Sequence, residues 1–189
     1  KGASHSLWRI SKLRNLLDQS HTEKLVHAFV TSRLDYCNSL FAGSYNYQFR
    51  KLQHIQNAAA RLVVRRKLDR HVDMTPILQE LHWLPVVVRV EFKILCIIFK
   101  LIRHSESAPH YLKELISIHI PNIHTKSCEG LKLNYQNVRS KSKAYGDRAF
   151  TTYAPVLWNS LPAFLRNINE LDIFKVQLKT FLNISLIKL

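Results

Sequence analysis

Basic side chains recur at helical spacing between residues 47 and 65, and this pattern is the most suggestive chemistry in the sequence. On a helical wheel at 100° per residue, five polar side chains of this segment fall within a sector of about 80°. They are Arg50, His54, Asn57, Arg61 and Arg65. No Asp or Glu lies between Asp35 and Asp69, so ion pairs at i,i+4 spacing do not account for the bases. A row of cations is suited to the phosphates of a nucleic-acid backbone.

Further bases extend this pattern beyond the predicted helix. Arg66 and Lys67 follow its C-terminal end, and a separate basic run occupies residues 139–143. We predict phosphate contact by the bases that face away from the apolar side of the helix and by the separate run. These candidates are Arg50, His54, Arg61, Arg65, Arg66, Lys67, Arg139, Lys141 and Lys143. An ordinary solvent-exposed polar face is the alternative interpretation.

Patterns that would support catalysis are missing from the sequence. Polymerases and nucleases need two or three carboxylates that converge on a divalent metal, usually with one close pair in sequence. None of the six Asp and seven Glu residues are adjacent to one another. There is no Gly-rich phosphate-binding loop and no His-Glu-x-x-His pattern. We therefore predict that this chain is not an enzyme, holds no cofactor and has no small-molecule substrate.

The three cysteines indicate a reducing environment. Cys37, Cys96 and Cys128 are far apart and odd in number, which argues against a disulfide framework. No Cys-x2-Cys pair provides zinc-ligand spacing. Cys96 lies in an apolar run and is interpreted as a small core residue. We expect an intracellular protein, nuclear or cytoplasmic or both.

The overall charge points to a polyanionic partner. Among 189 residues, 28 Lys and Arg face 13 Asp and Glu, which gives a formal net charge of +15. Such an imbalance repels the compact state unless a polyanion offsets it, so nucleic acid is the first candidate. A merely soluble basic domain is the alternative. An anionic membrane is disfavoured because the bases are scattered, and four cations within residues 86–103 argue against a membrane span.

Helical periodicity dominates the chain, and with only four glycines it predicts an all-α fold. Helices are expected over residues 4–17, 22–36, 47–65, 75–81, 86–103, 110–116, 148–160 and 171–182. Thr22 is the expected N-cap of the second helix. The expected buried stripe of this helix is Leu25, Val26, Phe29, Val30 and Leu34. Trp158 is interpreted as a core residue rather than a base-stacking one.

Composition and periodicity predict that the chain is divided into three parts. Residues 1–116 are predicted to form a helical bundle, and residues 144–189 a small helical C-terminal subdomain. Residues 117–143 carry Pro, Asn, Ser and the basic run, which is typical of an irregular loop that orders on binding a polyanion.

Three stretches resemble the C-terminal region of jockey-like and chicken-repeat-like polymerases of non-LTR retrotransposons, the LINE class. They are residues 23–40 (EKLVHAFVTSRLDYCNSL), residues 53–101 (from QHIQNAAARLVVRR to HWLPVVVRVEFKILCIIFKL) and residues 144–162 (AYGDRAFTTYAPVLWNSLP). Their order and spacing are specific, and together they cover most of the chain. Residues 117–138 match only loosely, and no zinc knuckle is present.

The resemblance implies the thumb and C-terminal extension of a reverse transcriptase, an RNA-directed DNA polymerase. In that family the thumb is a helical bundle that lies against the template-primer duplex. The implied partners are RNA or an RNA–DNA hybrid, together with the fingers-palm core of the same polymerase, which would use Mg²⁺. That core and the endonuclease domain of such elements are missing from this sequence, and we expect the natural chain to begin upstream of Lys1.

Two other classes of function compete with a nucleic-acid-binding module. A helical protein–protein adaptor would present a defined apolar patch, and its binding would depend little on salt. A decayed copy of the element would have no selected activity, and the isolated chain would aggregate through apolar surface meant for the missing core.

Overall fold

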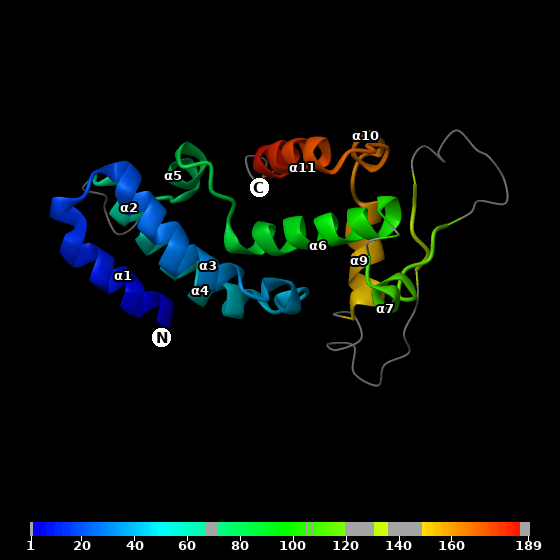
Figure 1. The fold of residues 1–189 in the computed structure, drawn as a ribbon, viewed down its shortest axis with the longest axis horizontal. Helices are drawn as coiled ribbons and strands as arrows, with labels where there is room; N and C mark the ends of the chain where they lie inside the picture. The colour runs from blue at the N-terminus through cyan, green and yellow to red at the C-terminus, as the bar shows by residue number, and fades with distance from the viewer. Residues whose placement is uncertain are drawn as a thin grey trace. The chain divides into compact units, whose positions relative to one another are not determined.

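The structure, a computed structural model, describes residues 2–66, 72–104, 106, 108–119, 131–135 and 149–185. Within these ranges the chain is all-α, as predicted, and the residues pack as two units, 1–90 and 91–189 (Figure 1). The division predicted from composition, after residue 116, is a different one and stays a prediction. Lys67, Arg139, Lys141 and Lys143, and most of the predicted loop, lie outside the described residues.

The first unit consists of α-helices joined by short 3-10 and π-helical turns. They are α1 (Gly2–Leu13), the 3-10 turn η1 (Arg14–Leu16), α2 (Gln19–Val26), the π-helical turn η2 (His27–Thr31), α3 (Ser32–Asp35), the 3-10 turn η3 (Asn38–Phe41), α4 (Asn46–Val64) and α5 (Thr75–Glu80). Helix α6 (Val86–Arg103) begins in this unit and continues into the second. Its bounds confirm the helix predicted over residues 86–103.

Asp18, and not Thr22, caps helix α2. The backbone of Asp18 is extended, and its carboxylate accepts a hydrogen bond of 2.6 Å from the amide of His21. Thr22 lies inside the helix, fully buried, and its hydroxyl donates to the carbonyl of Asp18 at 2.7 Å. The expectation for Thr22 was wrong because Asp18 and Thr22 are both good capping residues, and the one that comes first in the chain starts the helix.

The π-helical turn η2 corrects the predicted stripe of the second helix. Val26, Val30 and Leu34 are buried as expected, but Phe29 is 50% exposed. The amide of Ser32 bonds to the carbonyl of His27, five residues earlier. A π-helical turn holds an extra residue compared with an α-helical one, so side chains four apart stay on one face and Phe29 turns outward.

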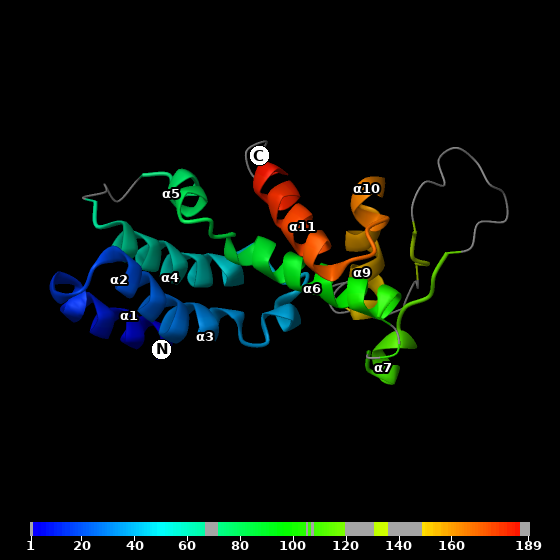
Figure 2. The ribbon, with the colours of Figure 1, turned by 45° about the horizontal axis from the view of Figure 1, so that its top comes forward.

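The core of the first unit forms where α4 packs against α1, α2 and α5 (Figure 2). The apolar side of α4 is buried as its periodicity predicts, with Ala60 and Val63 at 0% exposure. Around it lie apolar residues of the neighbouring helices, namely Ile10, Val26, Val30, Leu34, Met74, Ile77 and Leu78. This packing orients the opposite, polar side of α4 toward solvent.

The connection from α5 to α6 is held by polar contacts to helices far away in sequence. Trp83 is 5% exposed, and its indole N–H donates to Glu23 at 3.2 Å. The buried side chain of Gln56 donates to the carbonyl of Leu84 at 2.8 Å. The carbonyl oxygen of the Gln53 side chain accepts from the amide of Val86 at 2.9 Å. The contact between Trp83 and Glu23 thus joins residues 23–40 and 53–101, the first two of the stretches that carry the family resemblance.

The second unit contains the rest of α6 with α7 (His110–Lys113), α9 (Phe150–Asn159), α10 (Ala163–Arg166) and α11 (Leu171–Ser185). Its core contains a row of aromatic rings, with centroids 4.4 Å apart for Phe99 and Phe174 and 5.9 Å apart for Trp158 and Phe174. Trp158 is fully buried, and its indole donates to the carbonyl of Leu131 at 2.9 Å. Its interpretation as a core residue is confirmed.

A buried arginine and an asparagine hold residues 131–135 against α9 and α10. Arg166 is 6% exposed and donates to the carbonyls of Leu161 at 3.0 Å and Leu131 at 3.3 Å. Burial lowers the pKa of this guanidinium. The side chain of Asn159 bonds to both the amide and the carbonyl of Leu133, each at 2.9 Å. The periodicity of the sequence predicts neither the burial of Arg166 nor the hydrogen bonds of Asn159.

Candidate nucleic-acid interface

The polar side of α4 presents cationic side chains to solvent. Arg50, Lys51 and His54 are exposed, whereas Arg61 is half-buried. We call these four residues, together with Arg65 at the C-terminal end, the α4 basic face. Sequence reasoning omitted Lys51, which lies beside the predicted sector but in the same acid-free stretch. Because Lys51 is exposed as well, the exposed bases of α4 extend beyond the predicted 80° sector of the helical wheel.

Arg65 ends α4 in an unusual backbone conformation. It is the C-cap residue and has a φ of 59°, in the left-handed region that favours glycine. Its side chain is exposed, and one terminal nitrogen donates to the carbonyl of Arg14 at 2.9 Å. An arginine therefore stands where glycine would strain the backbone less.

Arg66 is engaged by an acid, and its predicted contact with phosphate stays a prediction. Its guanidinium forms an ion pair with Glu80 of α5, and the two side chains are 60% and 45% exposed. Sequence reasoning missed this pair because Glu80 is 14 residues away and meets Arg66 only after folding. A pair this exposed contributes little stability, so a phosphate can compete with Glu80 for the arginine.

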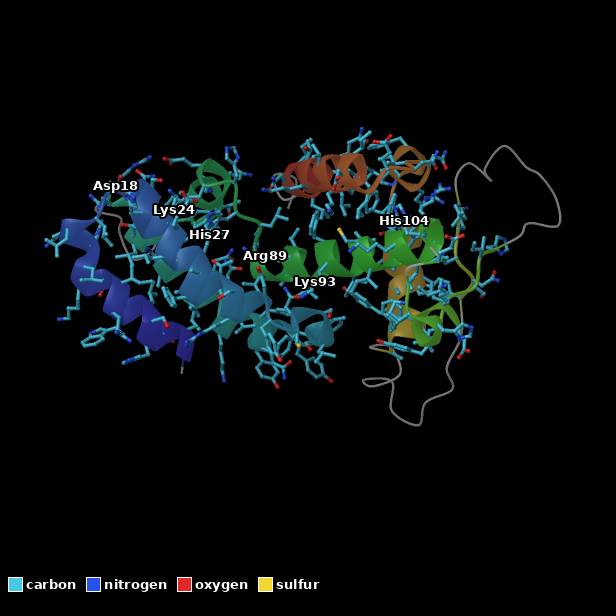
Figure 3. All side chains as sticks on the ribbon, in the orientation of Figure 1. Asp18, Lys24, His27, Arg89, Lys93 and His104 are labelled. Carbon is cyan, nitrogen blue, oxygen red and sulfur yellow. The ribbon has the colours of Figure 1, made fainter. Side chains whose placement is uncertain are left out.

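The acids of the first unit are occupied away from Arg50, Lys51 and His54. Of the described acids, Asp18 contacts His21, Glu23 contacts His27 and Trp83, Asp35 binds Arg89, Asp73 accepts hydrogen bonds from Thr75, and Glu80 binds Arg66. Figure 3 labels Asp18, His27 and Arg89 among these groups. Within the described part of the chain, no ion pair involves any of the three bases. The positive charges of Arg50 and Lys51 and the ring nitrogens of His54 are therefore available to an external anion.

Two of these acids have a lowered pKa, and in both cases the main cause is a hydrogen bond from a nearby backbone amide. The amide of His21 lowers the pKa of Asp18, to which the positive charge of Arg65 adds a smaller effect. The amide of Thr75 lowers the pKa of Asp73. Hydrogen bonds thus favour the ionised form of both carboxylates, Asp18 as the N-cap of α2 and Asp73 two residues before the start of α5, where negative charge also suits the helix dipole.

Burial shifts the pKa of further ionisable groups. Burial raises the pKa of the Cys96 thiol to about 11, which keeps it protonated at neutral pH. Burial also raises the pKa of Glu91 in the second unit. No group of three or more His, Cys, Asp or Glu residues that could hold a metal ion occurs in the described ranges. None of the helices described there is long and apolar enough to cross a bilayer.

Together these observations define the α4 basic face as a cationic strip on a rigid helix. A backbone carrying regularly spaced negative charges is the ligand that such a strip fits best. Comparison of the chain with models of known protein families, with curated proteins and with solved structures found no match.

Proposed function

We propose that this chain is the thumb and C-terminal extension of a non-LTR retrotransposon RNA-directed DNA polymerase. In this role it catalyses nothing itself and holds the backbone of the template-primer duplex through the α4 basic face. The observation that carries the proposal is the exposure of Arg50, Lys51 and His54 on one helix whose described acidic neighbours are all engaged elsewhere. The three similar stretches of sequence supply the polymerase context.

The length of α4 suits this role. Its 19 residues form a rod of about 28 Å, long enough to follow several consecutive phosphates. Buried Phe49 and Val63 fix the opposite side in the core, so the helix that carries the cations is formed before the ligand arrives. A preformed helix loses less backbone conformational entropy on binding.

The expected mode of binding is contact with the backbone. Arginine and lysine bind phosphate regardless of sequence, whereas sequence is read from base edges. An RNA–DNA hybrid or RNA helix has a narrow, deep major groove that side chains do not read, so proteins recognise it mainly by shape and backbone. We therefore expect binding that is independent of sequence and strongly weakened by salt.

Fluorescence anisotropy with a labelled blunt RNA–DNA hybrid tests the proposal. If the chain contacts about six phosphates, its affinity falls about a thousandfold between 50 and 200 mM salt. The triple variant Arg50→Gln, Lys51→Gln, His54→Gln should bind more weakly and have a salt slope smaller by about two. The control Lys179→Gln removes an exposed charge from α11 of the second unit and should change neither quantity.

Two results would overturn the proposal. One is an affinity that stays constant over this salt range, and the other is a triple variant that binds as tightly as the unchanged chain. Circular dichroism of the triple variant checks that its helices are retained, since all three replaced side chains are exposed.

A protein partner is the second candidate, favoured by large apolar side chains at the surface of the first unit. Leu16 is 83% exposed and Leu40 is 81% exposed. A contiguous patch of such residues would mark a surface that another protein covers, and the polymerase core would be the expected partner. Replacing both by Ser should abolish binding to that core and leave hybrid binding unchanged.

A further inference from the structure

Two tyrosines are stacked on the surface just before and within the first turn of α4. The ring centroids of Tyr45 and Tyr47 are 6.1 Å apart and their planes are inclined by 18°. Both remain open to solvent, with exposures of 55% and 59%. We call them the tyrosine pair. Exposed, nearly parallel rings of this kind offer an outer face for a third planar group.

The tyrosine pair lies at one end of the α4 basic face. Tyr47 precedes Arg50 and Lys51 by three and four residues, the spacings at which side chains are neighbours on a helix. At 100° per residue, Tyr47 is about 20° from His54 around the helix axis. The surroundings are thus cationic and aromatic together, and no acid occurs in the sequence between Asp35 and Asp69.

This combination identifies the class of ligand. A protein surface that binds single-stranded nucleic acid uses basic groups for the phosphates and aromatic rings for the bases, because every base has a π-face. A base inside a duplex is already stacked on both sides and has no free face. An unpaired base at the end of a duplex has one.

We propose that the tyrosine pair is a stacking platform for an unpaired nucleobase. It would receive the base where one strand continues beyond a duplex held along the α4 basic face. The platform rests on the proposed function, since the basic face must first hold the duplex. It adds a specific consequence, namely that the chain prefers a duplex with a single-stranded extension to a blunt one.

The test compares the full chain on two RNA–DNA hybrids of equal duplex length, one blunt and one with a short single-stranded extension. The extended hybrid should bind about tenfold tighter, within the range measured for stacking of one base on an aromatic ring. Tyr47→Ala should remove this preference and leave the affinity for the blunt hybrid within about twofold. Tyr47→Phe keeps the ring and should restore the preference.

Two further variants complete the design. Tyr45→Leu removes the other half of the pair and should reduce the preference. Tyr111→Ala removes a tyrosine that is 67% exposed on α7, in the second unit, and should leave the preference unchanged.

The outcomes separate the two proposals. If the blunt hybrid binds with the expected salt dependence but the extension adds nothing, the platform is wrong and the basic face stands. The platform is also wrong if Tyr47→Ala weakens both hybrids equally, or if it keeps the preference for the extended one. If the blunt hybrid does not bind at all, the proposed function itself fails. If the tyrosine pair binds a protein instead of a base, the variants at Tyr45 and Tyr47 should discriminate between the extended and the blunt hybrid as the unchanged chain does, and the platform is wrong.

Discussion

Arg89 at the start of α6 binds Asp35 at the end of α3 through two nitrogens. Its Nε lies 2.8 Å from one carboxylate oxygen of Asp35, and a terminal nitrogen contacts the other oxygen. The side chain of Arg89 is 20% exposed and that of Asp35 is 37% exposed. The pair joins two of the stretches that carry the family resemblance, residues 23–40 and 53–101, and its two members are 54 residues apart in the chain.

Breaking this pair should destabilise the first unit. We expect Asp35→Asn to lower the free energy of unfolding by about 2 kcal/mol, because it leaves a half-buried guanidinium without its charged partner. Urea unfolding followed by circular dichroism measures this. Arg89→Lys should fall between Asp35→Asn and the unchanged chain, since lysine cannot make the two-point contact. Effects of Asp35→Asn and Arg89→Gln that simply add in the double variant would contradict a direct interaction.

Substitutions at Arg65 should separate stability from binding. Arg65→Gly relieves the left-handed backbone, so it should be about 1 kcal/mol more stable than Arg65→Ala, which keeps the strain and loses the same hydrogen bond. Both variants lack the cation and should weaken hybrid binding equally. Thermal unfolding and anisotropy measured on the two proteins check this. A glycine variant that is less stable than the alanine variant would show that the backbone of Arg65 is not strained.

Glu91 should give the stability of the second unit a particular pH dependence. Burial raises its pKa in the folded state above the ordinary value of 4.5. Between these two values the folded chain binds more protons than the unfolded chain, so stability falls as pH rises through this window and remains lower above it. Glu91→Gln mimics the protonated side chain and should therefore stabilise the chain at pH 7 but not at pH 4.

Urea unfolding of Glu91→Gln at both pH values provides the measurement. Glu106→Gln removes an exposed carboxylate instead and should have little effect at either pH. An equal gain from Glu91→Gln at pH 4 and pH 7 would mean that packing, and not burial of charge, explains the effect.

The cysteines should differ in their reactivity in the folded chain. Cys37 is exposed, whereas Cys96 is partly covered and has a pKa raised to about 11 by burial. Only the thiolate is alkylated, so at pH 8 iodoacetamide should modify Cys37 at least about tenfold faster than Cys96. Peptide mass spectrometry after timed quenching measures both rates. The difference should vanish in denaturant, and its persistence there would point to local sequence rather than burial.

Long periodic helices were predictable from the sequence, and local irregularities were not. Helices α4 and α6 have strong apolar periodicity, and their predicted ranges agree with the structure to within a residue. The π-helical turn escaped detection because one extra residue barely changes a pattern averaged over several turns. The cap at Asp18 was missed because residues of capping type occur three times within five positions, at Asp18, Ser20 and Thr22.

Contacts between residues far apart in the chain could not be predicted from the sequence. The exposure of Arg50 and His54 follows from the periodicity of a single helix, so sequence placed them on the polar side. Gln56 and Arg166 are buried because they bond to carbonyls 28 and 35 residues away. Such partners are determined only by tertiary packing, and the same holds for the ion pair that engages Arg66.

The π-helical turn η2 also determines the direction in which α3 presents its side chains. Its additional residue rotates every later position by about 100° around the axis, relative to an uninterrupted α-helix. Asp35 comes after that offset, and its carboxylate contacts Arg89. Deleting one residue between His27 and Thr31 would therefore produce a more regular helix and yet disconnect it from α6, so the length of this segment matters more than its composition.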